Sequence, residues 1–128
     1  MKVVQELVAY FDRRGELSKT HLRKLLDQGF LAADAPPTML DLCEAVGASF
    51  YFRVRGAVEG PLWGTGVYTG DSLLAAAAVH AGLVKPDQTA IVKVTVVAPL
   101  AQYQGSVSNG VTSHDFGRYG AAYRLSAV

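Results

Sequence analysis

Residues 71–81 read DSLLAAAAVHA, and this stretch decides the fold of the chain. Leucine and alanine are strong helix formers, and Gly82 follows as a residue that readily takes the left-handed conformation at a helix end. Asp71 and Ser72, with Thr69 just before them, offer side-chain oxygens that can cap the helix start. A helix that is apolar on nearly all sides is buried. The stretch therefore predicts a central Ala-rich helix around which the rest of the chain wraps.

Strand-like segments flank the predicted helix, because they are rich in aromatic and β-branched residues. They are residues 50–55 (FYFRVR), 90–97 (AIVKVTVV) and 122–125 (AYRL). Two glycine-rich stretches, residues 56–70 and 103–120, are interpreted as long loops. The second contains Asn109-Gly110, a favoured tight-turn pair. Helix and strands together predict an α+β fold in which β-strands and long loops wrap the helix.

The first 48 residues are expected to form separate units. Apolar residues recur at helical spacing through residues 3–31, with Gly15 between two stretches, which predicts a helical hairpin. Residues 32–38 (AADAPPT) contain two consecutive prolines and are interpreted as a linker, and residues 39–46 allow a short helix. The expected units are the hairpin at residues 1–31, the linker and short helix at residues 32–48, and the main domain at residues 49–128.

Composition limits the functions that the chain can have. Its 128 residues are 50% apolar and 18% charged, which suits one globular domain. The net charge of +1 comes without a basic stripe, so we expect no nucleic-acid partner. No apolar stretch approaches the roughly 20 residues that a membrane span needs. The N-terminus lacks the pattern of a signal peptide and Cys43 is the single cysteine, so the cytoplasm is the expected location.

Four short motifs resemble the LCCL domain family. They are LWGTGVYTGDS at residues 62–72, AAVHAG at residues 77–82, YQGSVSNGVTS at residues 103–113 and YRL at residues 123–125. They occur in the family's order and spacing, and the resemblance covers about residues 49–126. It implies a compact fold with one central helix wrapped by strands, and no catalytic activity. It also implies a binding or interaction module for a carbohydrate, a lipopolysaccharide-type ligand or a protein partner.

The chain departs from the family in its cysteines. Many LCCL domains carry four cysteines in two disulfides, one of them near the start of the central helix, where this chain has Ala75. Without these cross-links, each worth about 2–4 kcal/mol, the apolar core has to supply the stability. The resemblance implies an extracellular setting, whereas a disulfide-free variant suits the inside of a cell, so both locations stay open.

Eight residues are predicted to contact a ligand, because aromatic, amide and charged side chains beside glycine-rich loops are typical of sugar-binding sites. They are Trp63, Tyr68, Asp71, His80, Tyr103, Asn109, Arg118 and Tyr119. A structural role is the alternative for them. For His80, in the last turn of the predicted helix, that role is a hydrogen bond to a loop carbonyl that holds loop 103–113 against the helix. For Trp63 and Tyr68 it is burial in the core.

No catalytic, metal or cofactor site is predicted. Cys43 lies in an apolar helical context, which favours a small buried side chain over a nucleophile paired with a histidine. The three histidines have no carboxylate or cysteine at metal-ligand spacing. Residues 113–115 (SHD) are adjacent in the chain, and adjacent residues do not converge as a catalytic triad. Residues 64–66 (GTG) lack the third glycine of a dinucleotide-binding loop.

Self-association is the alternative function. The predicted N-terminal hairpin has apolar faces at Leu7-Val8-Phe11 and Leu22-Leu25-Leu26, which offer a contact for a homo-oligomer. The same faces would also allow the hairpin to pack on the main domain or to recruit a partner. These alternatives stay open at the level of sequence.

Overall fold

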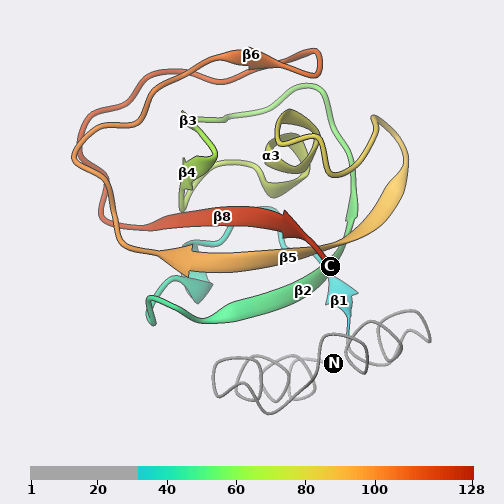
Figure 1. Cartoon of the computed structure of the whole chain (residues 1–128), viewed down its shortest axis with the longest axis horizontal. Coiled ribbons are helices and arrows are strands. Elements are labelled where there is room, and N and C mark those ends of the chain that lie inside the picture. Colours follow the sequence, from blue (N-terminus) through green and yellow to red (C-terminus); the bar gives the residue numbers. More distant parts are fainter. Residues whose placement is uncertain (1–31) are drawn as a thin grey trace.

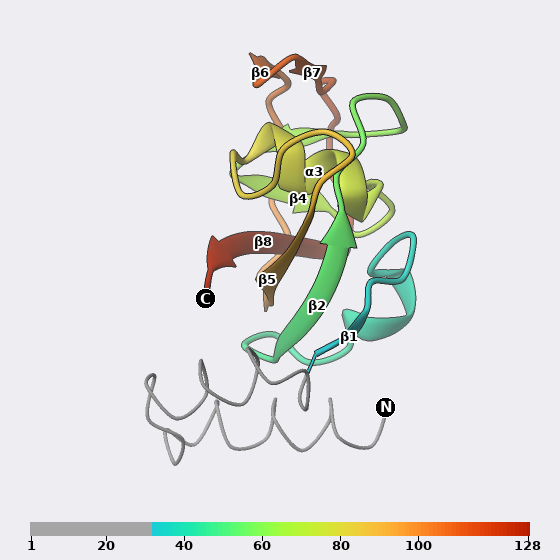
Figure 2. The same cartoon turned by 90° about the vertical axis from the view of Figure 1, so that its right-hand side faces the viewer.

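The structure is a computed structural model that describes residues 32–128, so the helical hairpin predicted for residues 1–31 lies outside the described residues. Its elements are β1 (Ala33–Asp34), the 3₁₀ helix η1 (Leu40–Leu42), β2 (Ser49–Arg55), β3 (Gly64–Thr65), β4 (Val67–Thr69), α3 (Leu74–His80), β5 (Thr89–Val97), β6 (Val107–Ser108), β7 (Val111–Thr112) and β8 (Ala122–Ala127). Helix α3 lies between the main sheet and the β6–β7 hairpin in both Figure 1 and Figure 2. Within the described residues, no helix is long and apolar enough to span a bilayer.

The main sheet has the strand order β1-β2-β5-β8-β4-β3. β1 runs parallel to β2, and the other neighbouring pairs are antiparallel. Alternate side chains of β2 and β5 enter the same buried cluster as the alanines of α3. They are Phe50, Phe52, Val54, Val92, Val94 and Val96. The strands predicted at residues 50–55, 90–97 and 122–125 are confirmed, and each extends slightly beyond its predicted bounds.

Helix α3 is buried through its small side chains. Residues 76–78, three consecutive alanines, are fully buried, and Val79 is 1% exposed. The helix ends as predicted, because Gly82 adopts a φ of 79°. The Gly82 N–H donates to the Val79 carbonyl at 2.9 Å, and the Leu83 N–H donates to the Ala78 carbonyl at 3.0 Å, which is the Schellman pattern. Alanine lets the sheet and the hairpin approach the helix backbone closely.

The start of the helix corrects the prediction. The helix begins at Leu74 rather than at Asp71, and its N-cap residue makes no side-chain hydrogen bond, so the predicted capping roles are wrong. The Ser72 hydroxyl instead accepts the Trp63 N–H at 3.0 Å and lies 2.8 Å from the Thr69 hydroxyl. These oxygens are engaged in the turn between β4 and α3 and in its contact with β3, which leaves them unable to cap the helix.

Short strands lie in both segments that the sequence predicts to be loops. β3 and β4 lie within residues 56–70, and β6 and β7 form a hairpin within residues 103–120. Strands of two or three residues are too short to show an alternation pattern, so sequence reasoning misses them. The tight turn at Asn109 and Gly110 is confirmed, with φ of 51° and 79°.

The segment 32–48 packs into the main domain, which corrects its interpretation as a linker. β1 joins the sheet through its pairing with β2, and the predicted short helix is the single turn η1. Ala32 and Met39 are fully buried, and the Met39 N–H donates to the Gly70 carbonyl at 3.0 Å. The two prolines interrupt strand pairing after β1, but they do not interrupt packing.

Two core tyrosines are expected to make the stability of the fold depend on pH in the alkaline range. Tyr123 is fully buried, its hydroxyl donates to the Ser72 carbonyl at 3.0 Å, and burial raises its pKa well above the usual 10.0. Burial also raises the pKa of Tyr68. Both hydroxyls hold their protons more tightly in the folded chain than in the unfolded chain. Their contribution to the stability of the fold is therefore fully present below about pH 10 and is lost as the pH rises further. We expect the free energy of unfolding, measured by urea denaturation, to fall steeply above about pH 10.

Tyr123→Phe is the matched variant for this pH dependence, because it removes the ionisable hydroxyl and keeps the ring. It should be less stable than wild type at pH 8 by about 1 kcal/mol, for the lost hydrogen bond. It should also lose less stability than wild type as the pH rises above about 10. Equal alkaline losses in the two proteins would show that Tyr123 does not contribute.

Candidate functional site

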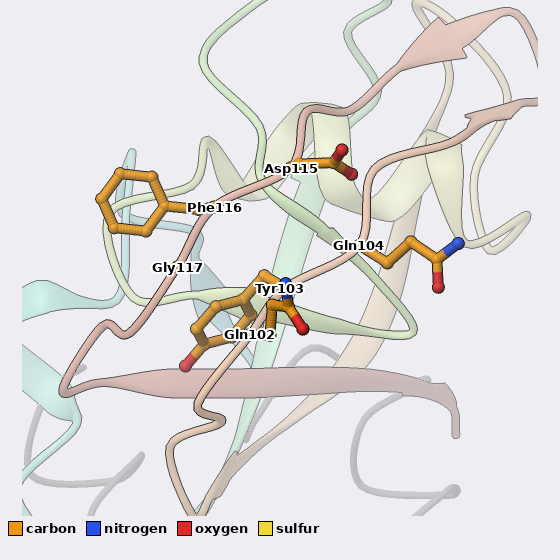
Figure 3. Close-up of a pocket in the computed structure, with 6 residues that line it drawn as sticks. All are labelled: Gln102, Tyr103, Gln104, Asp115, Phe116 and Gly117. Atoms are coloured by element: carbon orange, nitrogen blue, oxygen red, sulfur yellow. The ribbon is translucent and has the colours of Figure 1, made fainter.

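Two segments of the chain between β5 and β8 border an open groove, shown in Figure 3. The residues that line it are Gln102, Tyr103, Gln104, Asp115, Phe116 and Gly117. Its volume is about 550 Å³. Backbone hydrogen bonds hold the segments side by side, from the Tyr103 N–H to the Phe116 carbonyl at 2.7 Å and from the Phe116 N–H to the Tyr103 carbonyl at 2.9 Å. The groove therefore combines a paired main chain with amide, carboxylate and aromatic side chains.

An aromatic row, consisting of Trp63, Phe116 and Tyr119, adjoins the groove. Phe116 lines the groove and packs edge-on against Trp63, with ring centroids 6.1 Å apart, and against Tyr119, at 5.8 Å. The side chain of Phe116 is 42% exposed, and Trp63 and Tyr119 are half-buried. A backbone bridge between Trp63 and His114 brings the beginning of β3 beside this segment. The row thus offers apolar ring surface next to hydrogen-bonding groups.

The eight residues predicted to contact a ligand divide by burial. Three have exposed surface in or beside the aromatic row: Trp63, Arg118 and Tyr119. Three are 2% exposed or less: Tyr68, His80 and Tyr103. Asn109 is exposed at the hairpin turn, and Asp71 is half-buried before α3. The structure therefore brings only part of the predicted set to one surface.

Tyr103 makes a hydrogen bond to the backbone of Tyr119, and the charge of Asp71 affects the Tyr119 hydroxyl. The Tyr103 hydroxyl donates to the Tyr119 carbonyl at 3.0 Å and accepts the Leu100 N–H at 3.1 Å. Burial, followed by the negative charge of nearby Asp71, raises the pKa of the Tyr119 hydroxyl. A tyrosine hydroxyl is protonated at neutral pH in any case, so the raised pKa only extends the protonated form of Tyr119 further into the alkaline range.

His80 connects α3 to the loop that forms the groove. Its Nδ1 lies 2.9 Å from the Tyr68 hydroxyl, and its Nε2 lies 3.1 Å from the Ser106 hydroxyl and 3.2 Å from the Ser106 carbonyl. The Asn109 amide donates to the His80 carbonyl at 3.1 Å. The predicted structural role of His80, a hydrogen bond that holds loop 103–113 against the helix, is confirmed.

The direction of these hydrogen bonds follows from the Gln104 carbonyl, which can only accept and which ends the series. The Thr65 hydroxyl donates its one proton to the Gln104 carbonyl at 2.8 Å, so in its 2.6 Å contact with Ser106 it accepts. Ser106 has then used its own proton and accepts from His80 Nε2–H, which leaves the lone pair on Nδ1 to accept from Tyr68. Since the basic nitrogen of His80 faces Tyr68, Ser106 and His80 are not arranged as a nucleophile and its base.

Other residues that invite a catalytic interpretation have structural contacts. Cys43 is a free, half-buried cysteine, and burial raises the pKa of its thiol, which disfavours the reactive thiolate. The Ser113 hydroxyl accepts the Ser106 N–H at 2.9 Å and donates to the Ser106 carbonyl at 3.2 Å. The Asp115 carboxylate accepts the Gly105 N–H at 2.7 Å. Among residues 32–128, no three His, Cys, Asp or Glu side chains lie close enough to hold a metal ion.

Sequence reasoning misses five of the six groove residues, which are Gln102, Gln104, Asp115, Phe116 and Gly117. Two of them flank Tyr103, a residue that the prediction includes, but a loop has no period that shows which side chains share a face. The contact of Phe116 with Trp63 depends on two segments that are distant in the chain. No local signal could have identified Phe116 as the residue where groove and aromatic row meet.

The buried helix, the six-stranded sheet and the loop-borne groove define a small α+β domain of the LCCL type. The family model of the LCCL domain matches residues 43–122, and the chain belongs to this family. The chain is also similar to the Homo sapiens protein "Cysteine-rich secretory protein LCCL domain-containing 2", with 39% identity over 70 residues. The matched part is 53% of this chain and spans 14% of that relative. The resemblance inferred from the four sequence motifs is therefore confirmed.

Proposed function

We propose that the chain is a non-enzymatic carbohydrate-binding module and that the groove, together with the aromatic row, is its ligand site. Membership of the LCCL family supports a binding or interaction module. The observation that carries the carbohydrate proposal is the position of Phe116, whose exposed ring belongs both to the amide-lined groove and to the aromatic row.

The side chains of the groove match the two kinds of surface that a sugar presents. The amides of Gln102 and Gln104 each offer donors and acceptors for hydroxyl groups, and the Asp115 carboxylate offers acceptors. The ring of Phe116 offers a flat apolar face for the C–H side of a pyranose. The groove volume of about 550 Å³ is within the range of small-molecule sites. Exposed Arg118 adds a positive charge that suits the phosphate or carboxylate groups of lipopolysaccharide-type ligands.

A glycan array that also carries lipopolysaccharide tests this proposal. We expect the wild-type chain to bind at least one glycan class and Phe116→Ala to weaken that binding by at least about tenfold, because aromatic side chains that a ligand covers carry much of the binding energy. Val107→Ala is the matched control, because Val107 is 73% exposed on β6 and does not line the groove. A flat array for wild type, or equal binding by Phe116→Ala and wild type, would contradict the proposal.

We also propose an extracellular setting for the chain. The human relative is named a secretory protein, which supports this setting, and no comparison supports the cytoplasmic expectation from the sequence. The free Cys43 is compatible with either compartment, because a single cysteine has no internal partner to pair with. Fractionation of the native host culture into medium and cells would decide between the two locations, and recovery only from the cells would contradict this proposal.

A further inference from the structure

Gln104 lines the groove, and the two residues that follow it in the segment 104–106, Gly105 and Ser106, are fixed on one side by residues 113–115 of the same loop. The Gly105 N–H donates to Asp115 at 2.7 Å, and the Ser106 backbone bonds to the Ser113 hydroxyl through both its N–H and its carbonyl. The contact is close, because a Cβ atom at Gly105 would lie 2.6 Å from the Ser113 carbonyl oxygen. On this side, close packing against the backbone of residues 113 and 114 and hydrogen bonds together fix the segment.

The other side of the segment is held by side chains that do not line the groove. Thr65 on β3 donates to the Gln104 carbonyl at 2.8 Å, and its oxygen lies 2.6 Å from the Ser106 hydroxyl. His80 reaches the same hydroxyl at 3.1 Å from α3. The hydrogen bonds run in one direction, from the buried Tyr68 through His80, Ser106 and Thr65 to the backbone of a residue that lines the groove.

We propose that Thr65 and His80 are positioning residues for carbohydrate binding, which act by fixing the backbone of Gln104 and so the direction of its side chain. This inference rests on the proposed function of the groove. A carbonyl that has lost its donor turns toward water, and the flanking amide groups then lose the geometry that a sugar hydroxyl requires. Affinity for a glycan is thus set in part by hydroxyl and imidazole groups that never touch it.

Thr65→Val tests the proposal, because it keeps the β-branched shape of an exposed strand residue and removes only the hydroxyl. Thr65→Ser restores the hydroxyl, and Thr112→Val makes the same change on exposed β7. The probe is the glycan with the strongest signal for wild type on the array, and its Kd is measured by titration calorimetry. Amide hydrogen exchange of Gly105 and Ser106 is measured without any glycan.

The expected result is a Kd about tenfold higher in Thr65→Val, with wild-type values in Thr65→Ser and Thr112→Val, since one hydrogen bond corresponds to about that factor. Exchange at Gly105 and Ser106 should be about tenfold faster in Thr65→Val alone. A wild-type Kd in Thr65→Val overturns this inference and leaves the proposed function intact. A wild-type chain that binds no glycan removes the proposed function and this inference with it.

Discussion

His80→Ala should destabilise the fold by about 3 kcal/mol, which is among the largest losses expected for a single polar residue of this chain. The substitution leaves the Tyr68 hydroxyl without its acceptor at a position only 1% exposed, and it opens a cavity where the imidazole ring was. It also releases Ser106 from α3. The measurement is urea denaturation at pH 7, supported by a melting temperature that should fall by roughly 10–20 °C.

His114→Ala is the matched control for this substitution. His114 is exposed, and its backbone makes two hydrogen bonds, from its N–H to the Leu62 carbonyl and from the Gly64 N–H to its carbonyl. Its replacement should change stability by no more than about 0.5 kcal/mol. If His80→Ala unfolds at the same urea concentration as wild type, the proposed role of His80 as the link between helix and loop is wrong.

Ala77→Leu should be at least as damaging, with an expected loss of about 3 kcal/mol or failure to fold. Ala77 is fully buried in α3, between the sheet and the β6–β7 hairpin, as Figure 2 shows for the helix as a whole. Because Ala77 is fully enclosed, the added carbons of leucine are expected to displace the neighbouring elements, and overpacked cores lose about 1–3 kcal/mol or more. Chemical denaturation and the near-ultraviolet circular dichroism of the core tyrosines measure the effect.

Ala75→Leu is the matched control, because it makes the same substitution on the same helix at a partly exposed position. Ala75 is half-buried and borders a second open groove, of about 520 Å³, beside β2. We expect its stability to stay within about 0.5 kcal/mol of wild type. Equal effects of the two leucines would contradict the account of α3 as a helix enclosed through its alanines.

Sequence patterns that extend over six or more residues predict the long strands and the helix of this fold. The strands of two or three residues leave no such pattern. β2 and β5 are long enough for aromatic and β-branched residues to indicate strands, and Gly82 marks the end of α3 correctly. β3, β6 and β7 have two residues each, so their pairing depends on neighbours that only the folded chain brings together. The helix start shows the same limit, because Ser72 has an alternative partner in Trp63.

The candidate site follows the same division. A histidine in an apolar helix requires buried hydrogen-bond partners, so a loop anchor at His80 is predictable from sequence. The identity of those partners, Tyr68 and Ser106, depends on the packing of β4 and the loop against α3. Phe116 carries no signal of its own, because its importance comes from contact with Trp63 across the fold.

An NMR titration provides the sharpest test of carbohydrate binding at the groove and the aromatic row. The ¹⁵N-labelled chain is titrated with the strongest ligand from the array, and amide and indole shifts are followed. We predict that the largest shifts occur at residues 102–104 and 115–119 and at the Trp63 indole. The claim would be contradicted if saturating ligand left these signals in place, or if the largest shifts lay at Arg53 and Arg55 beside the second groove.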